Sequence, residues 1–329
     1  MATIWFLLIL LCLLMYVVLD GYDLGNGIAS LVEPDASHRH ELLEHVAQAW
    51  DGNETWLVLL GVSLWAGFPA AFGTLLPHAY LPVIVMLFGL IVRGVSVEMA
   101  SQAHPAPRWE RAFGVASLIT ALAQGVAVAT LTADVSMASP FGAISWFSAL
   151  SAVTVVCGYL ALGYAYTKWK ATGELRARAG RRGAVSALLG ALLAIGCLIA
   201  VGATATPLSV DGPARTIAFS GLLLFAVAGA VMSVITLRPT SPYDGLPLAG
   251  LVTAVVALVI ALVVARYPVL APGGLTLANT AAPPGTLRFL AVGIGLNVPL
   301  ILFYNWFAHY AFRGKAPANH LPNGTGAAR

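Results

Sequence analysis

The stretch "MATIWFLLILLCLLMYVVLDG", residues 1–21, determines the fold class. Its apolar run is long enough to cross a bilayer, because a membrane-spanning helix needs about 20 predominantly apolar residues. No Lys or Arg precedes the run, so it lacks the charged n-region of a secretory signal peptide. The stretch therefore predicts a first membrane helix that is retained in the mature chain.

The rest of the chain shares this composition. Of its 329 residues, 59% are hydrophobic and 9% are charged, and the mean hydropathy is +0.85. Soluble proteins carry about 25% charged residues, so the chain is predicted to be an all-α, polytopic membrane protein. The net charge of +3 matters less than its placement, because the basic residues gather between apolar runs. Nucleic acid is therefore not an expected partner.

Nine apolar runs, bounded by charges, Pro and Gly, predict nine membrane helices. The polar segment 31–47 between the first two predicts a short helix at the membrane surface. We expect one transmembrane domain over residues 1–312, followed by a disordered cytoplasmic tail over 313–329 that is rich in Pro, Gly and Asn. The nine runs cover residues 3–27, 48–68, 77–97, 111–132, 143–167, 184–204, 214–237, 246–266 and 286–312.

The basic residues predict the orientation in the membrane. The segment "KWKATGELRARAGRR", residues 168–182, lies between two apolar runs and is rich in Lys and Arg, which is typical of a cytoplasmic loop under the positive-inside rule. Of the 17 Lys and Arg residues, all but Arg215, Arg266 and Arg288 fall on the same side as this segment. The N-terminus is therefore expected in the periplasm and the C-terminus in the cytoplasm.

A first polar cluster, "LDGYDLGNG", closes the first predicted helix at residues 19–27. Asp20 and Asp23 are three residues apart and share one face of a helix. Gly21 and Gly25 have the spacing of small residues that lets another helix approach closely. This pattern predicts two acids at a packed helix contact. The alternative is that the helix has ended by Asp20 and that both acids are solvated.

A second polar cluster, "WDGNETW", runs from Trp50 to Trp56 at the start of the second predicted helix. Asp51 and Glu54 share a face there, and the two tryptophans flank them at a depth typical of a membrane interface. Asp51 could merely cap the helix. Capping needs only one acid, however, and Asn53 and Glu54 follow within three residues.

A third cluster, "LIVRGVSVEMASQ", places Arg93 and Glu98 at the end of the third predicted helix. Five residues apart, they lie on different sides of a helix and are not expected to pair with each other. Arg93 is then free to balance an acid from the first or second helix. The alternative is that Arg93 extends to the lipid surface.

The acids of these clusters all fall near the predicted cytoplasmic face. A charged residue at the centre of a membrane helix costs about 2.5–3.5 kcal/mol, so such groups usually face a bundle interior or a watery cavity. Carboxylates in those places often belong to proton routes. The clusters therefore predict the mouth of a proton channel.

The histidines argue against a haem within this chain. His38, His40 and His45 fall in the first loop, His78 and His104 lie near loops, and His320 lies in the tail. Only His309 is in a predicted helix, whereas a bis-histidine haem needs two facing histidines. The three cysteines stand alone in apolar runs. We expect no cofactor and no metal in this chain.

The stretches "LDGYDLGNGI" (19–28), "WDGNETWL" (50–57) and "RGVSVE" (93–98) resemble, in order and spacing, subunit II of cytochrome bd-type quinol oxidases, including the cyanide-insensitive branch. The resemblance implies two four-helix bundles plus a further helix, in the bacterial inner membrane. It implies a heterodimer with a subunit I that carries haems b and d. The further partners that it implies are membrane lipid and a small accessory subunit. Such an oxidase oxidises quinol and reduces oxygen to water.

The resemblance also implies that subunit II supports assembly and helps conduct protons from the cytoplasm, with no catalytic residue of its own. The residues that it assigns to the proton pathway are Asp20, Asp51, Asp23 and Glu54, and the supporting residues are Trp50, Asn53, Arg93 and Glu98. Gly94 stands where some members have proline, which affects the local helix geometry.

Two alternatives remain open. One is a secondary transporter whose acids couple ion flow to substrate movement. The acids gather at one face, and only Asn297 and Pro299 interrupt a helix in the way that transporters do, which disfavours this alternative. The other is a scaffold whose acids only bind the partner chain.

Overall fold

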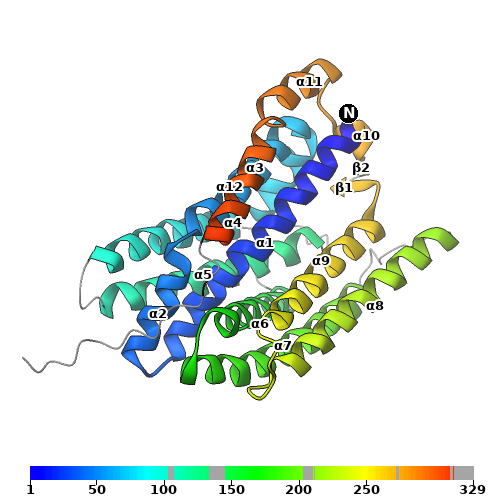
Figure 1. The fold of residues 1–329 in the computed structure, drawn as a ribbon. Helices are drawn as coiled ribbons and strands as arrows, with labels where there is room; N and C mark the ends of the chain where they lie inside the picture. The colour runs from blue at the N-terminus through cyan, green and yellow to red at the C-terminus, as the bar shows by residue number, and fades with distance from the viewer. Residues whose placement is uncertain are drawn as a thin grey trace, which may run out of the picture.

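The computed structural model describes residues 1–102, 107–132, 145–202, 210, 212–271, 274–311 and 314, and they are mostly helical (Figure 1). A short antiparallel pair, β1 (Val269–Ala271) and β2 (Leu275–Thr276), accompanies the helices. The helices are α1 (Ala2–Val32), α2 (Ala36–Ala47), α3 (Trp50–Gly67), α4 (Pro69–Gln102), α5 (Pro107–Thr132), α6 (Trp146–Lys170), α7 (Gly173–Gly202), α8 (Pro213–Thr236), α9 (Leu246–Arg266), α10 (Leu277–Thr280), α11 (Pro284–Gly293) and α12 (Asn297–Ala311).

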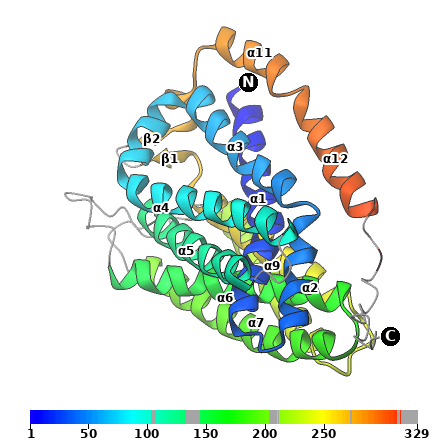
Figure 2. The same cartoon turned by 90° about the vertical axis from the view of Figure 1, so that its left-hand side faces the viewer.

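The long helices form two groups of four with one further helical segment. The first group contains α1, α3, α4 and α5, and the second contains α6, α7, α8 and α9 (Figure 1). Both α1 and α5 pack against α6, so these contacts join the two groups. The α11–α12 segment lies along the outer side of α3 (Figure 2). The expected architecture of two four-helix bundles plus a further helix is confirmed.

Eight helical segments among the described residues are long and apolar enough to cross a membrane. One of them joins α11 and α12 over Pro284–Ala308, and α3 is not among them. The helix α3 is 18 residues long and carries Asp51 and Glu54, which lowers its hydropathy. It occupies the place of the second predicted membrane helix and packs against α1.

The helix α1 continues past the point where the sequence predicts its end, to Val32. Its polar residues find partners inside the fold. Thr167 of α6 donates a hydrogen bond of 2.7 Å to the Asn26 side chain, and Ser30 donates one of 2.7 Å to the Gly27 carbonyl. The alternative in which the helix ends by Asp20 is therefore wrong.

The basic segment 168–182 is not the loop that its charges suggest. Only two residues separate the end of α6 at Lys170 from the start of α7 at Gly173. The charges are satisfied by pairing: Arg178 and Arg182 both bind Glu33, whose side chain is only 1% exposed. Arg178 and Arg182 lie on α7, so a run of positive charge here does not interrupt the secondary structure.

Two other predicted boundaries need correction. The third predicted helix begins at Pro69 rather than near residue 77, since Pro77 and Pro82 lie inside α4. The ninth predicted helix is two helices, because α11 ends at Gly293 and α12 begins at Asn297. Of the predicted tail, 313–329, only residue 314 lies within the described residues.

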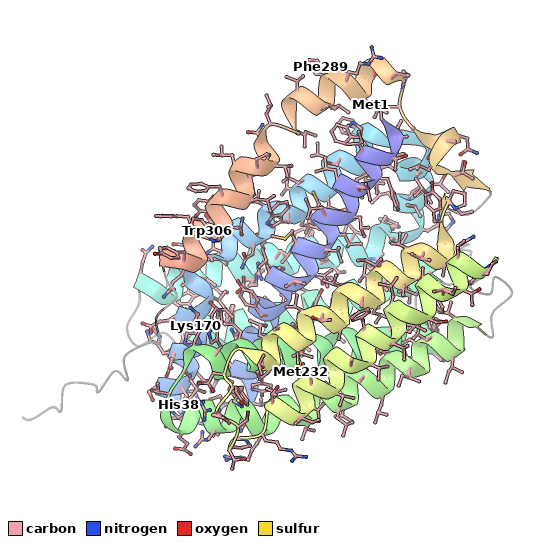
Figure 3. The ribbon with its side chains drawn as sticks, turned by 45° about the vertical axis from the view of Figure 1, so that its right-hand side comes forward. Met1, His38, Lys170, Met232, Phe289 and Trp306 are labelled. Atoms are coloured by element: carbon pink, nitrogen blue, oxygen red, sulfur yellow. The ribbon has the colours of Figure 1, made fainter. Side chains whose placement is uncertain are left out.

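The helix α2 confirms the short helix predicted within 31–47. Asp35 caps it by accepting hydrogen bonds from the backbone N–H groups of Ser37 and His38. The helix lies at the end of the molecule opposite the N-terminus: in Figure 3, His38 and Lys170 lie toward one end, and Met1 lies toward the other.

The buried histidine of α2, His45, makes the stability of the fold depend on pH. Burial, with a smaller contribution from the charge of Lys170, lowers the pKa of His45 from 6.5 to about 4. Between these values the unfolded chain binds a proton that the folded chain does not. The free energy of unfolding should therefore decrease by about 1.4 kcal/mol per pH unit as the pH falls from 6.5 toward 4. Urea titrations of the wild type and His45→Gln in detergent should show this dependence only in the wild type; equal slopes would contradict the prediction.

Candidate functional site

Two acids of α1 lie inside the protein, at a close helix contact. The Asp20 and Asp23 side chains are buried, at 0% and 1% exposure. The helix α6 approaches at Gly25, where an added Cβ atom would lie 1.8 Å from the Tyr159 carbonyl oxygen. The glycine spacing on α1 thus serves the close packing that the sequence predicts, and the acids lie beside it.

Arg93 of α4 balances acids from two other helices. Its Nη1 atom lies 2.5 Å from Oδ1 of Asp20 on α1, and its Nη2 atom lies 2.6 Å from Oε1 of Glu54 on α3. Arg93 is fully buried, so the alternative in which it extends to the lipid surface is wrong. A buried arginine must be paired and hydrogen-bonded, because an uncompensated charge in the interior costs several kcal/mol.

Asn53 of α3 binds the second acid of α1. Its Nδ2 atom donates hydrogen bonds to Oδ2 of Asp23, at 2.8 Å, and to the Tyr22 hydroxyl, at 3.0 Å. Asn53 is fully buried. We call the group formed by Asp20, Asp23, Asn53, Glu54 and Arg93 the acid cluster.

The acid cluster contains more polar atoms than it pairs internally. Among the described residues, the buried atoms without a hydrogen-bond partner include Oδ2 of Asp20, Oδ1 of Asp23, Oδ1 of Asn53 and Nε of Arg93. Buried polar groups in folded proteins are almost always paired, with protein or with ordered water. These atoms leave the acid cluster with hydrogen-bonding capacity that its own side chains do not use.

Asp51 lies outside the acid cluster. It is exposed in the first turn of α3, and its Oδ1 atom accepts a hydrogen bond of 2.8 Å from the Gly52 backbone. It interacts electrostatically with Glu54, one helical turn away. Asp51 and Thr55 line a groove of about 510 Å³, together with α12 residues that include Tyr304 and Asn305. Glu54, which precedes Thr55 in the sequence, is the partly exposed acid of the cluster, with 23% of its side chain exposed.

The remaining predicted residues have different surroundings. Trp50 packs against Gly94, where an added Cβ atom would lie 2.9 Å from the indole ring. Glu98 is exposed, whereas Arg93 is buried, so the structure does not place Glu98 in the acid cluster. Trp56 is 0% exposed and packs in a core cluster with Tyr16.

A second buried polar group, missed in the sequence, adjoins the acid cluster. Gln124 of α5 donates a hydrogen bond of 2.6 Å to the Tyr16 hydroxyl, and Tyr159 of α6 donates one of 2.5 Å to the Gln124 carbonyl oxygen. All three side chains are buried. Two signals could have found this group: Tyr16 precedes Asp20 by four residues, and Gln124 is an isolated amide in an apolar helix.

The described part of the chain contains no group of three or more His, Cys, Asp or Glu residues arranged to hold a metal ion. His38, His40 and His45 all lie on α2. His104 and His320, and the side chain of His309, lie outside the described residues.

Comparison with known proteins identifies a family that this chain matches. The family model "Cytochrome bd terminal oxidase subunit II" matches residues 1–312. Over 95% of its length, the chain is 24% identical to cytochrome bd ubiquinol oxidase subunit 2 of Bacillus subtilis (strain 168), of which 96% is covered. It is also 26% identical to cytochrome bd-I ubiquinol oxidase subunit 2 of Escherichia coli (strain K12), over 56% of this chain and 53% of that protein.

The fold has a counterpart among solved structures. A chain in the structure of bd oxidase from Geobacillus thermodenitrificans superposes with a TM-score of 0.73, covering 93% of this chain and 98% of that one at 16% identity. At this identity the likeness establishes the fold alone.

Proposed function

Because this chain belongs to the cytochrome bd terminal oxidase subunit II family, it is a subunit of an oxidoreductase complex, and we propose that its acid cluster conducts protons. The complex is a quinol oxidase that reduces oxygen to water, which consumes protons. In this proposal the protons come from the cytoplasm, and the haems b and d lie in a partner, subunit I, that also oxidises the quinol. This chain then contributes no haem and no catalytic residue.

The observation that carries the proposal is the imbalance of charge in the acid cluster. Three carboxyl groups, Asp20, Asp23 and Glu54, surround the single guanidinium of Arg93. One cation compensates one carboxylate, and each further buried charge costs several kcal/mol. The neutral cluster therefore holds protons on its remaining carboxyl groups, which gives it the capacity to take up and release protons. A purely structural ion pair needs only one acid.

The arrangement also supports a direction of transfer. Asp51 lines the groove, Glu54 follows it on the same face of α3, and Arg93 links Glu54 to Asp20. Asp23 lies one turn further along α1 and is held by Asn53. The proposed route therefore begins at Asp51 in the groove and enters the acid cluster at Glu54, with bound water between the carboxyl groups.

The proposed setting is the bacterial inner membrane, with the C-terminus in the cytoplasm. There the chain supports assembly of a heterodimer with subunit I, and a small accessory subunit is an additional candidate partner. Membership of the family favours this function over a secondary transporter. It leaves the scaffold alternative, in which the same acids only hold the two chains together.

Variants of Asp23 separate conduction from scaffolding. In the purified oxidase, Asp23→Asn should lower quinol-dependent oxygen consumption at least about tenfold, because the amide keeps the hydrogen-bonding shape but cannot carry a proton. The reduced-minus-oxidised optical spectrum, measured on the same sample, should show an unchanged haem content.

The matched control is Asp35→Asn, which alters an exposed acid at the cap of α2. It should leave oxygen consumption at the wild-type rate. Full oxygen consumption by Asp23→Asn at normal haem content would remove Asp23 from the proton route. Loss of haem together with activity would instead support the scaffold function.

A further inference from the structure

The buried group formed by Tyr16, Gln124 and Tyr159 adjoins Asp20, and its hydrogen bonds have a defined direction. The Tyr16 hydroxyl oxygen accepts a hydrogen bond from Nε2 of Gln124. The Gln124 carbonyl oxygen accepts the hydroxyl proton of Tyr159. An amide has two donor hydrogens on one end and an acceptor on the other, so Tyr159 selects the orientation in which Gln124 presents its N–H groups to Tyr16.

This direction leaves the hydroxyl hydrogen of Tyr16 available for another acceptor. The Tyr16 hydroxyl interacts with the carboxyl group of Asp20, which lies one helical turn away on the same face of α1. Oδ1 of Asp20 binds Arg93, while Oδ2 has no hydrogen-bond partner within 3.5 Å among the described residues. The hydroxyl hydrogen and the unpaired carboxylate oxygen are thus a donor and an acceptor of complementary type.

Asp20 and Asp23 differ in the groups that face them. Asp20 binds the guanidinium of Arg93 through Oδ1, which favours a carboxylate, and the Tyr16 hydroxyl is the available donor for its other oxygen. Among the described residues, the hydrogen bond that the structure shows to the Asp23 side chain comes from the neutral amide of Asn53. Two acids separated by less than one turn of helix therefore have surroundings that favour different protonation states.

We propose that the Tyr16–Gln124–Tyr159 chain positions a hydroxyl donor that keeps Asp20 as a permanent carboxylate, and that Asp23 is the acid that carries the proton. Tyr16 and Gln124 are positioning residues in this scheme, since they act on the proton route through Asp20. The inference rests on the proposed proton conduction, and it divides the two acids of α1 into a fixed counter-ion for Arg93 and a mobile proton site.

Infrared spectroscopy of the purified oxidase tests the inference without relying on turnover. A protonated carboxyl group gives a C=O stretching band that a carboxylate does not. In wild-type protein at neutral pH, the band should be weakened by Asp23→Asn. Tyr16→Phe should then produce a new band, with the protonated fraction of Asp20 rising about tenfold, because one hydrogen bond to a charged group is lost. The new band should be absent from the Tyr16→Phe/Asp20→Asn double variant.

Gln124→Met provides an independent second variant that leaves the tyrosine in place. It should produce the same new band with a smaller amplitude, because Tyr16 retains its hydroxyl but loses its orientation. Thr130→Val is the matched control on α5: Thr130 is also buried, but its hydroxyl donates to the Val126 carbonyl of its own helix. It should leave the spectrum unchanged.

The outcomes separate this inference from the proposed function. If Asp23→Asn leaves the wild-type carboxyl band unchanged, or if Tyr16→Phe and Gln124→Met both match the wild-type spectrum, the division between the two acids is wrong. If the bands behave as expected but Asp23→Asn retains full oxygen consumption, Asp20 is still the fixed counter-ion and the proton-conducting function fails instead.

Discussion

Replacing Arg93 with methionine is expected to destabilise the folded chain by about 3–5 kcal/mol, the usual result of removing one partner from a buried ion pair. Arg93 is fully buried and binds Asp20 and Glu54 on two different helices. Its loss would leave both carboxyl groups inside the bundle without a cation. We expect a much lower yield of assembled oxidase in the membrane and a lower thermal midpoint of what remains.

Neutralising the acids provides the internal test of this explanation. Adding Asp20→Asn and Glu54→Gln to Arg93→Met should restore most of the lost thermal stability, because no uncompensated charge then remains. Arg181→Met, at an exposed arginine of α7, should leave the midpoint close to that of the wild type. A single Arg93→Met variant as stable as Arg181→Met would show that the ion pairs do not hold α1, α3 and α4 together.

A single methyl group at Gly163 of α6 is expected to destabilise the chain by about 3 kcal/mol. An added Cβ atom would lie 2.5 Å from the Gly25 carbonyl carbon and 2.6 Å from the Asn26 nitrogen of α1. These are backbone atoms, so the clash cannot be relieved by a rotamer change and the two helices must separate. Overpacking in a well-packed interior usually costs about 1–3 kcal/mol, and a rigid backbone contact lies at the upper end. Thermal unfolding of the purified oxidase in detergent measures the effect.

The same helix contains a matched control for this substitution. An added Cβ atom at Gly158 would have no neighbour within 4 Å. Gly158→Ala should therefore be neutral or stabilise α6 by about 0.5–1 kcal/mol, the intrinsic preference of a helix for alanine. If Gly158→Ala and Gly163→Ala shift the midpoint equally, helix propensity rather than the α1–α6 contact explains the change.

The sequence predicted the membrane class and most of the helices because both depend on local composition. Runs of about 20 apolar residues determine the spans wherever they occur, and α9 has the predicted bounds of 246–266. The predictions were wrong where polar residues continue a helix. Ser30, Pro77 and Arg178 lie at or beyond the predicted helix ends, yet each lies within a helix. Arg178, for example, forms an ion pair with Glu33 at the end of α1. A hydropathy pattern does not show such a partner, because the two residues are far apart in the sequence.

The acid cluster shows the same division. The spacing of Asp20 and Asp23, and of Asp51 and Glu54, indicated which residues share a helix face, since that depends only on helix geometry. Which acids meet Arg93 depends on how α1, α3 and α4 pack: Asp20 and Glu54 bind it, while Asp51 faces the groove. Gln124 joins Tyr16 and Tyr159 across three helices.

The sequence by itself therefore determined a polytopic helical protein with carboxyl groups in its membrane helices. Only the tertiary structure decided which carboxyl groups are paired with a cation and which lack a partner. The physical reason is range: hydrophobic length and helix periodicity act within one segment, whereas the pairing of a buried charge depends on atoms that the fold brings together from distant segments.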